Sequence, residues 1–393
     1  QYLSDLSVDK WQQTHVETAH NEVAKTLGQK NIIPNVSSAL FRKGGFDHLF
    51  EDEKWLGMKI CGDWIFYLHL IRGGKIAYSA DTNNYYRFHA ANSSVKTYVN
   101  RSYYEEHEAV ACEVAKLYDV PDKTLQGHRY FVERFFLENA SEMIAKGTRF
   151  DSLYDSSRIE ACRASRLPNL MIASYAFSTG GGEVFPIRLA IGLKRLGYGV
   201  TFFNFNGAEV NEAMRKTLAP DIPVVELSGR FAGVDNTLEN FGIEIVHTHH
   251  ASVDHFFAMG RLRSRDTISQ VVTMHGMYEA MDPSTFRANV IRMAAKVDQW
   301  IYIADKNLLP FEEYGLYQDN RFSKIGNGMV RPQIEPASRD EFGIGEDAFV
   351  ACLASRALPE KGWREAIRMT GEARRNTGRD IQLVLLGDGP VYD

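Results

Sequence analysis

The sequence predicts an α/β protein built on a doubly wound parallel sheet. Six short apolar runs alternate with helical segments through the middle of the chain, the pattern of strands that are buried on both faces and joined by helices. The runs are residues 170–174, 200–205, 224–227, 243–247, 271–274 and 300–303. In such a sheet, functional residues collect at the carboxyl ends of the strands.

A second α/β domain is predicted to begin near Phe322. It contributes a buried apolar strand at 349–354 and a second strand at 382–386, before the chain ends at Asp393. A complete partner domain would need on the order of 150 residues, so we expect about half of it here. The chain also begins at Gln1 without an initiator methionine or a targeting segment. We therefore interpret the sequence as a window on a longer polypeptide.

The amino-terminal part has a different pattern. Short strands are predicted at 32–41, 75–78 and 85–88, and a buried helix at 64–70. From 102 to 146 the apolar period becomes helical, with a break at Tyr118–Asp122. These patterns divide the chain into four expected parts: an α/β segment (1–101), a helical appendage and linker (102–166), the doubly wound domain (167–321) and the truncated domain (322–393).

Composition narrows the functional class. The chain has 44% hydrophobic and 24% charged residues and a net charge of −5, so it lacks the basic surface that nucleic acid requires. No apolar run approaches the roughly 20 residues that span a bilayer, so any membrane contact is expected to be peripheral. The four cysteines form no metal-like pair and are expected to be reduced, mostly buried thiols of a cytoplasmic protein: Cys61, Cys112, Cys162 and Cys352.

A glycine-rich segment follows the first strand of the doubly wound domain. Gly180, Gly181 and Gly182 precede Glu183 and open a helix. Consecutive glycines let the backbone approach a ligand, and a helix start offers free amide donors to a phosphate. The alternative is a tight strand-to-helix turn with no ligand. A nicotinamide site is disfavoured because the GxGxxG pattern is missing.

Histidines follow two neighbouring strands. His247 and His249 come at the end of one apolar run, and His275 at the end of the next. Both groups are expected at the same edge of the sheet, where imidazole can hydrogen-bond a sugar hydroxyl or a phosphate, or ligate a metal. The alternative is a structural role.

A cationic pair lies between a strand and a helix of the second α/β domain. Arg356 and Lys361 can stabilise a diphosphate leaving group as its charge develops. The alternative is a solvated basic pair.

In the amino-terminal part, Asp63 starts an apolar helix, where a carboxylate is either an N-cap or a general base for an acceptor hydroxyl.

From about Leu167 onward, six segments in order resemble the GT-B glycosyltransferases of family 4. The segments are 180–183, 245–250, 272–276, 324–329, 355–362 and 387–390. The resemblance implies two Rossmann-like domains, the first binding mostly acceptor and the second a nucleotide sugar. It also implies metal-independent transfer with retention at the anomeric carbon, in which the leaving phosphate helps to deprotonate the acceptor.

The same resemblance assigns roles to individual residues. Gly181 and Gly182 would approach the donor diphosphate, His275 would contact the transferred sugar, and Arg356 with Lys361 would hold the phosphates. Further sugar or acceptor contacts are Glu183, His247, His249 and Asn327. The family's acidic Glu-x7-Glu segment would lie beyond Asp393, so the resemblance allows that this chain alone is inactive.

Three earlier segments resemble the acceptor-side half of a GT-A glycosyltransferase of family 2: 31–42, 61–67 and 85–94. The resemblance implies an inverting transfer that depends on a divalent cation, Mg²⁺ or Mn²⁺. Asp63 would be the catalytic base, and His89 would lie near the metal and the diphosphate. The Asp-x-Asp metal motif of that family would lie before Gln1.

The leading hypothesis is part of a tandem glycosyltransferase, GT-A followed by GT-B, that uses nucleotide-sugar donors in polysaccharide biosynthesis. The acceptor would be a glycan or a lipid-linked glycan, and the protein would be cytoplasmic or peripheral at the inner face of the membrane. Two alternatives remain: a nucleotide-sugar epimerase of GT-B fold, and a glycan-binding module without catalysis.

Overall fold

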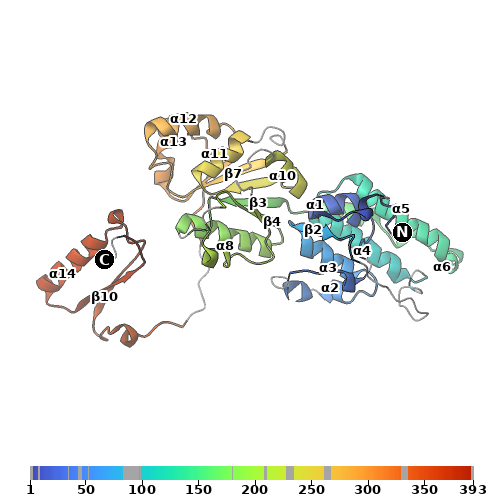
Figure 1. Ribbon diagram of the computed structural model, residues 1–393, viewed down its shortest axis with the longest axis horizontal. Helices are drawn as coiled ribbons and strands as arrows, with labels where there is room; N and C mark the ends of the chain where they lie inside the picture. The colour runs from blue at the N-terminus through green and yellow to red at the C-terminus, as the bar shows by residue number, and fades with distance from the viewer. Residues whose placement is uncertain are drawn as a thin grey trace. The chain divides into compact units, whose positions relative to one another are not determined.

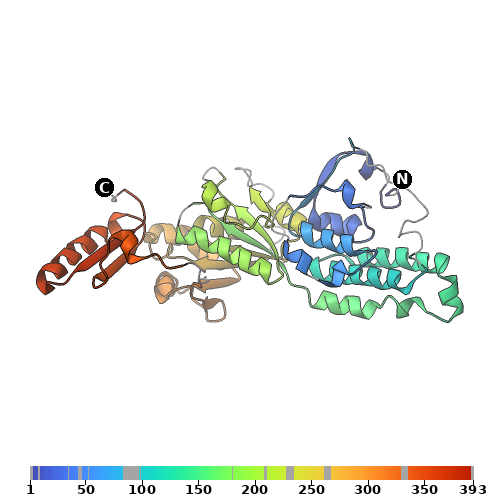
Figure 2. The same cartoon turned by 90° about the horizontal axis from the view of Figure 1, so that it is seen from below.

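The computed structural model describes the chain except for residues 1–2, 8, 34, 43–46, 52, 83–96, 98, 179, 208–209, 227–233, 261–266, 329–334 and 391–393. It divides into two compact units, Gln1–Asn327 and Gly328–Asp393. Figure 1 shows the elements of each unit, and Figure 2 shows them turned by 90°. No helix within the described ranges has the length and apolar composition needed to cross a membrane.

Eleven strands are found in the described part of the chain: β1 (His15–Thr18), β2 (Lys75–Tyr78), β3 (Asn169–Ser174), β4 (Gly199–Asn204), β5 (Val224–Glu226), β6 (Ile245–Thr248), β7 (Ser269–Met274), β8 (Gln299–Tyr302), β9 (Phe322–Lys324), β10 (Phe349–Ala354) and β11 (Ile381–Leu386).

The α-helices lie between these strands: α1 (Ala19–Glu22), α2 (Glu53–Leu56), α3 (Gly62–Ile71), α4 (Arg101–Leu117), α5 (Asp122–Asn139), α6 (Ser141–Ala145), α7 (Ser156–Ala164), α8 (Gly181–Arg195), α9 (Glu212–Arg215), α10 (Val234–Phe241), α11 (Ala251–Gly260), α12 (Pro283–Ala294), α13 (Leu309–Glu313) and α14 (Trp363–Thr377).

The first unit contains a seven-stranded sheet in the order β5-β4-β3-β6-β7-β8-β9. Every neighbouring pair in it is parallel. This is a Rossmann-like order, in which the chain moves outward from β3 in one direction and then, from β6, in the other. The doubly wound sheet expected from the alternating apolar runs is therefore confirmed.

Side chains of successive residues in β3 enter cores on opposite faces of the sheet. Met171 and Ala173 pack with α10 and α11, whereas Ile172 packs with Ile187 and Ala190 of α8. Figure 1 shows α8 on one side of the sheet and α10 and α11 on the other. Burial on both faces explains why the strands are continuous apolar runs instead of alternating patterns.

The boundary expected at 322 differs from the structure. Phe322, Ser323 and Lys324 pair with Trp300, Ile301 and Tyr302 of β8, which makes β9 the edge strand of the first sheet. Ladder hydrogen bonds and the stacking of Phe322 on Trp300, with ring centroids 5.8 Å apart, hold it there. The division of the chain follows Asn327 instead.

The amino-terminal residues and the helices that follow them share one hydrophobic core. Trp64 and Tyr67 of α3 are buried in a cluster with Val114 of α4, Phe136 of α5 and Ile159 of α7. The helix expected at 64–70, the strand at 75–78 and the helix break after Leu117 are all confirmed. The helices of 102–166 are thus an integral layer of this part and do not form a separate appendage.

A strand was expected at 32–41, and this prediction is wrong. Residues Val36–Ser38 form a 3₁₀ turn, in which the Oδ1 atom of Asn35 accepts a hydrogen bond of 3.0 Å from the backbone amide of Ser37. Asparagine and serine favour such local bonds over a ladder. The strand expected at 85–88 lies outside the described residues.

Polar contacts join the amino-terminal part to the sheet. The buried guanidinium of Arg72 donates to the carbonyl oxygens of Gly197 and Leu167 at 2.6 and 3.3 Å. Thr201 donates its hydroxyl to the carbonyl oxygen of Gly73 at 2.9 Å. Arg166 forms two bonds of 2.6 and 2.7 Å with the carboxylate of Glu244. These hydrogen bonds fix the amino-terminal part against the sheet.

The second unit pairs β10 with β11 in parallel, and α14 packs on β11. Strand β10 was expected to be buried, but Phe349 is 65% exposed and Cys352 is also exposed. The reason is that these two strands form a sheet of their own in the described part of the chain.

The expectation of mostly buried cysteines holds for Cys61, whereas Cys112 and Cys162 are half-buried.

Candidate functional site

The glycine-rich segment lies at the carboxyl end of β3. Gly180 has an extended backbone, and Gly181 begins α8. A Cβ atom added to Gly181 would meet nothing within 4 Å, and one added to Gly182 would meet only the Cβ of His275, at 4.0 Å. Neither residue has a positive φ. The fold therefore does not require glycine at these two positions, which favours close approach of a ligand over a tight turn.

The three histidines expected at one edge are brought together by the pairing of β6 with β7. The Nδ1 atom of His249 lies 3.0 Å from the Nε2 atom of His275. The rings of His247 and His249 stack with centroids 4.4 Å apart, and the Nε2 atom of His247 lies 2.7 Å from the hydroxyl of Thr273. We call His247, His249 and His275 the histidine cluster.

Burial keeps the histidine cluster neutral. It lowers the pKa of His247 to about 3 and the pKa of His275 to about 4. The pKa of His249 is also well below its usual value, first through burial and then through its two histidine neighbours. At neutral pH these rings are uncharged donors and acceptors. They can orient a hydroxyl group, but they cannot supply positive charge to a diphosphate.

One nitrogen of the cluster has no partner. The Nε2 atom of His249 is buried and makes no hydrogen bond. A buried polar atom of this kind costs free energy, and such atoms are rare in folded proteins. His249 follows β6, which pairs with β3 in the sheet. Strands β4 and β5 come between β3 and β6 in the sequence but lie on the other side of β3, so the strand order reverses here. That reversal of strand order is where doubly wound sheets bind their ligands.

The structure adds residues that sequence reasoning missed. The ring of Phe185, one helical turn into α8, lies 5.3 Å from the ring of His275 between centroids. Thr273 is the hydroxyl partner of His247. Thr273 could have been found from its position on β7, two residues before His275. Phe185 carried no signal, because its contact depends on the orientation of α8.

A second buried group supports the loop after β7. The hydroxyl of Tyr278 donates to the Oδ2 atom of Asp254 at 2.5 Å, and burial raises the pKa of Asp254 to about 7. Next to it, Asn307 donates to the Oε1 atom of Glu279 at 2.9 Å, and the ammonium of Lys306 lies 3.3 Å from the same oxygen. These contacts hold the loop that follows His275.

The other residues expected at the sheet edge occupy different environments. The carboxylate of Glu183 folds back over Gly180, where a Cβ atom would approach its Oε2 atom to 2.2 Å. Asn327 is exposed at the end of the first unit. It makes no contact with the histidine cluster that the structure records within the described residues.

In the second unit, the structure brings two sequence motifs together. The amide of Ser355 donates to the carbonyl oxygen of Leu386 at 3.0 Å, and the amide of Ala357 donates to that of Asp388 at 2.8 Å. Gly387 and Gly389 both have positive φ, and a Cβ atom at Gly387 would lie 1.9 Å from the carbonyl oxygen of Ser355. Glycine is therefore required at that crossing.

Arg356 and Lys361 lie between β10 and α14, as expected. Both side chains are exposed, and neither forms an ion pair with any residue in the described ranges. Two unpaired cations on one connection are available to an anionic ligand. Their role as a diphosphate clamp remains a prediction.

Asp63 is in the first turn of α3, but it does not cap the helix. The carboxylate of Glu106, from α4, accepts the backbone amides of Lys59, Ile60 and Cys61 at 3.0, 2.8 and 2.9 Å. The Oδ1 atom of Asp63 is buried without a partner, and burial raises the pKa of Asp63. The N-cap alternative is therefore disfavoured, which leaves a carboxylate with an unused oxygen.

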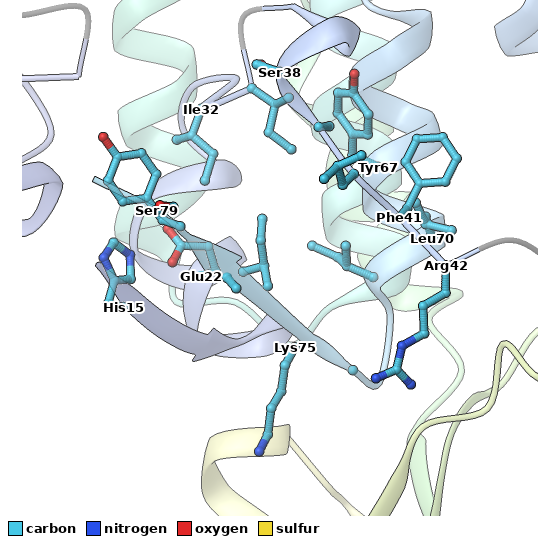
Figure 3. A pocket seen from close by; sticks show the side chains of 18 of the residues that line it. His15, Glu22, Ile32, Ser38, Phe41, Arg42, Tyr67, Leu70, Lys75 and Ser79 are labelled. Atoms are coloured by element: carbon cyan, nitrogen blue, oxygen red, sulfur yellow. The ribbon is translucent and has the colours of Figure 1, made fainter. Parts of the chain in front are cut away.

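A cavity of about 2170 Å³ is lined by the amino-terminal part and by residues between Pro220 and Phe241 of the parallel-sheet part. Figure 3 shows His15 and Glu22 on one side of it and Tyr67, Phe41 and Leu70 on the other. Its lining includes Tyr67 from α3 but not Asp63, and it includes none of the other residues expected to be functional. His89 lies outside the described residues.

Comparisons with known proteins fall on the part of the chain that holds the histidine cluster. Residues 179–325 match the model of a family described as Glycosyltransferase Family 4. No curated protein matches the chain.

Among solved structures, HepE of Anabaena in complex with UDP and glucose is 16% identical, with a TM-score of 0.44, and the match covers 57% of this chain and 62% of that one. A glycosyltransferase from Rickettsia africae is 16% identical with a TM-score of 0.44, covering 56% and 61%. The lipopolysaccharide outer core galactosyltransferase WaaB is 14% identical with a TM-score of 0.39, covering 57% and 62%.

Proposed function

We propose that this protein transfers a sugar from a nucleotide-sugar donor to a glycan or lipid-linked glycan acceptor, with retention at the anomeric carbon and without a metal in the Rossmann-like part. The match of residues 179–325 to a glycosyltransferase family supports the class of reaction. The observation that carries the proposal is the histidine cluster, which meets the glycine-rich start of α8 where the strand order of the sheet reverses.

The first unit would bind and orient the sugar. The free amides at the start of α8 can donate to phosphate oxygens, and Gly181 and Gly182 leave room for that approach. His275, held by His249, would hydrogen-bond the transferred sugar. As a neutral imidazole it can fix a hydroxyl without repelling the positive charge that develops at the anomeric carbon.

The second unit would stabilise the leaving group. Arg356 and Lys361 carry charge that is not neutralised by ion pairs in the described part of the chain. Breaking the bond between sugar and phosphate leaves negative charge on the nucleoside diphosphate. Cations placed in advance lower the barrier because they need no reorganisation as that charge appears. The departing phosphate oxygen would then take the proton of the acceptor hydroxyl.

The test is a transfer assay on the full-length gene product with radiolabelled nucleotide sugars, run with and without glycan acceptors. Label in a glycan product that requires the acceptor supports the proposal. An epimer formed from donor alone would identify the epimerase alternative. Binding of a glycan acceptor without any conversion of the donor would identify a glycan-binding module. No binding and no conversion with any nucleotide sugar would contradict the proposal.

A second transfer site is proposed around Asp63. Its support is the buried Oδ1 atom without a partner and the raised pKa, which suit a general base for an acceptor hydroxyl. A divalent cation would be needed for the inverting reaction of this type. The described residues contain no group of three metal-ligating side chains that could hold one, and His89 lies outside them, so no step is assigned to a metal.

This second site has its own test. Asp63→Asn should abolish inverting transfer in the full-length protein and leave retaining transfer unchanged. The matched variant His275→Asn should do the reverse. If both variants lower both products equally, the two sites are not separate.

A further inference from the structure

Helices α4 and α7 pack against each other in register. The carboxylate of Glu108 on α4 lies 2.5 Å from the guanidinium of Arg158 on α7 and accepts the backbone amide of Asp155 at 2.9 Å. Glu108 is buried, so this ion pair holds the two helices closely. One turn further along each helix, four residues from Glu108 and four from Arg158, lie Cys112 and Cys162.

These two cysteines are neighbours. Both pack against the same hydrophobic cluster of the amino-terminal part, and the Cys162 side chain is close enough to raise the pKa of the Cys112 thiol. Both side chains are half-buried, whereas Cys61 is fully buried and Cys352 lies in the other compact unit. Thiols that are neighbours and are partly open to solvent can react both with each other and with a small molecule.

We propose that Cys112 and Cys162 form a reversible disulfide by exchange with a low-molecular-weight disulfide of the glutathione class. The bond would join α7, the last helix before the parallel sheet, to the helical layer of the amino-terminal part. The inference is independent of the proposed sugar transfer, because neither cysteine is near the histidine cluster, Asp63 or the cationic pair in sequence or in any recorded contact.

The exchange takes place in two steps. The thiolate of Cys162 attacks one sulfur of the small disulfide, forms a mixed disulfide and releases one small thiolate. Cys112 then loses its proton to solvent and attacks the Cys162 sulfur, which forms the protein disulfide and releases the second small thiolate. Two protein thiols are oxidised, and one small disulfide is reduced to two thiols.

The order of attack follows from the surroundings of the two sulfurs. Burial and the neighbouring Cys162 side chain raise the pKa of Cys112 to about 12, so Cys112 is a poor first nucleophile. In the mixed disulfide, Cys112 is already beside the sulfur that it must attack. Closure within the pair is therefore favoured over a second bimolecular reaction.

The test uses the folded protein. It is incubated with oxidised glutathione, free thiols are blocked by alkylation, and a digest made without reductant is examined by mass spectrometry. We expect a peptide that links Cys112 to Cys162 and disappears after treatment with dithiothreitol. We also expect the midpoint of thermal unfolding to rise on oxidation, because the bond restricts the unfolded chain.

Cys352→Ser is the matched control and should give the same linked peptide. Cys112→Ser should stop the reaction at a glutathione adduct on Cys162. The proposal is overturned if Cys112 and Cys162 are both recovered alkylated while Cys352 carries glutathione. It is equally overturned if the cross-links found join Cys352 of two molecules.

Discussion

The Nδ1 atom of His249 lies 3.0 Å from the Nε2 atom of His275, so two neutral imidazoles from neighbouring strands share one hydrogen bond. One ring must donate and the other accept, which couples their tautomers. The shared bond occupies the Nε2 atom of His275 and leaves its Nδ1 atom as the other hydrogen-bonding atom of the ring. In the proposed transfer, that atom would bond the sugar and His249 would position the ring.

His275→Ala should lower kcat/KM of retaining transfer by about 10²-fold, the usual effect of removing one oriented hydrogen-bond donor from a transition state. His249→Asn should cause a smaller loss, because the ring of His275 remains. Steady-state transfer rates measure both. His15→Asn is the control, since His15 lies on β1 far along the chain from the sheet edge. Equal rates for wild type and His275→Ala would contradict the assigned contact.

Gly182→Ala separates the two interpretations of the glycine-rich segment. Alanine fits next to the Cβ of His275 at 4.0 Å and should stabilise the first turn of α8 by about 0.5 kcal/mol. Its methyl group would nevertheless obstruct approach of a diphosphate. We therefore expect a higher unfolding midpoint together with weaker binding of UDP-sugars, measured by calorimetry. Lower stability with unchanged binding would favour the turn without a ligand.

Stability should fall between pH 7 and pH 5. Burial lowers the folded-state pKa of His107 to about 4 and of His275 to about 4, below the ordinary value of 6.5. The unfolded chain therefore binds more protons than the folded one in this window, so the free energy of unfolding decreases as pH falls below 6.5. Each such histidine should cost about 1 kcal/mol at pH 5.5. Denaturant unfolding at pH 7.5 and 5.5 measures the difference.

His107→Gln provides the matched comparison for that pH effect. His107 lies 3.2 Å from the Nε2 atom of His128 in the core of the amino-terminal part. The variant should be less stable at pH 7.5 but lose less stability on acidification. If the free energy of unfolding of the variant falls with pH as steeply as that of the wild type, His107 is not one of the groups responsible.

Arg72→Met should lower the free energy of unfolding by about 2 kcal/mol, because it removes a buried guanidinium that donates to the carbonyl oxygens of Gly197 and Leu167. Arg101→Met removes an exposed ion pair with Glu105 at 3.2 Å and should change stability by less than about 0.5 kcal/mol. Denaturant midpoints compare the two. Similar effects of both substitutions would contradict the anchoring role of Arg72.

Asp63→Asn should stabilise the fold at pH 8. Burial raises the folded-state pKa of Asp63. The contribution of Asp63 to the free energy of unfolding is therefore fully present below the unfolded pKa, and it is lost as pH rises through the folded pKa. Replacing the charge removes that loss. An N-cap would behave in the opposite way and cost about 1 kcal/mol when replaced by alanine. Unchanged stability of the Asn variant together with lower stability of the Ala variant would restore the capping interpretation, because asparagine caps a helix as well as aspartate does.

The sequence predicted the sheet well because parallel strands buried on both faces are continuous apolar runs. It predicted β10 as buried for the same reason, and failed because β10 and β11 form a sheet of only two strands among the described residues, in which Phe349 is 65% exposed. The boundary at 322 failed because the run at 322–324 is short, and only pairing with β8 reveals which sheet it joins.

For the candidate site, the sequence placed His249 and His275 at one edge because the strands that carry them are consecutive. It could not predict Phe185, whose ring reaches the cluster through packing of α8, nor the capture of three amides by Glu106 from a distant helix. Such contacts depend on tertiary geometry, which local pattern does not encode.

The bonds made by Arg72 carry an evolutionary consequence. A guanidinium from the helix-rich portion donates to carbonyl oxygens just before β3 and β4, so the two portions stabilise each other. Recombination that joined these strands to a different amino-terminal neighbour would have to bring a replacement cation with it. The two portions are therefore expected to be inherited together.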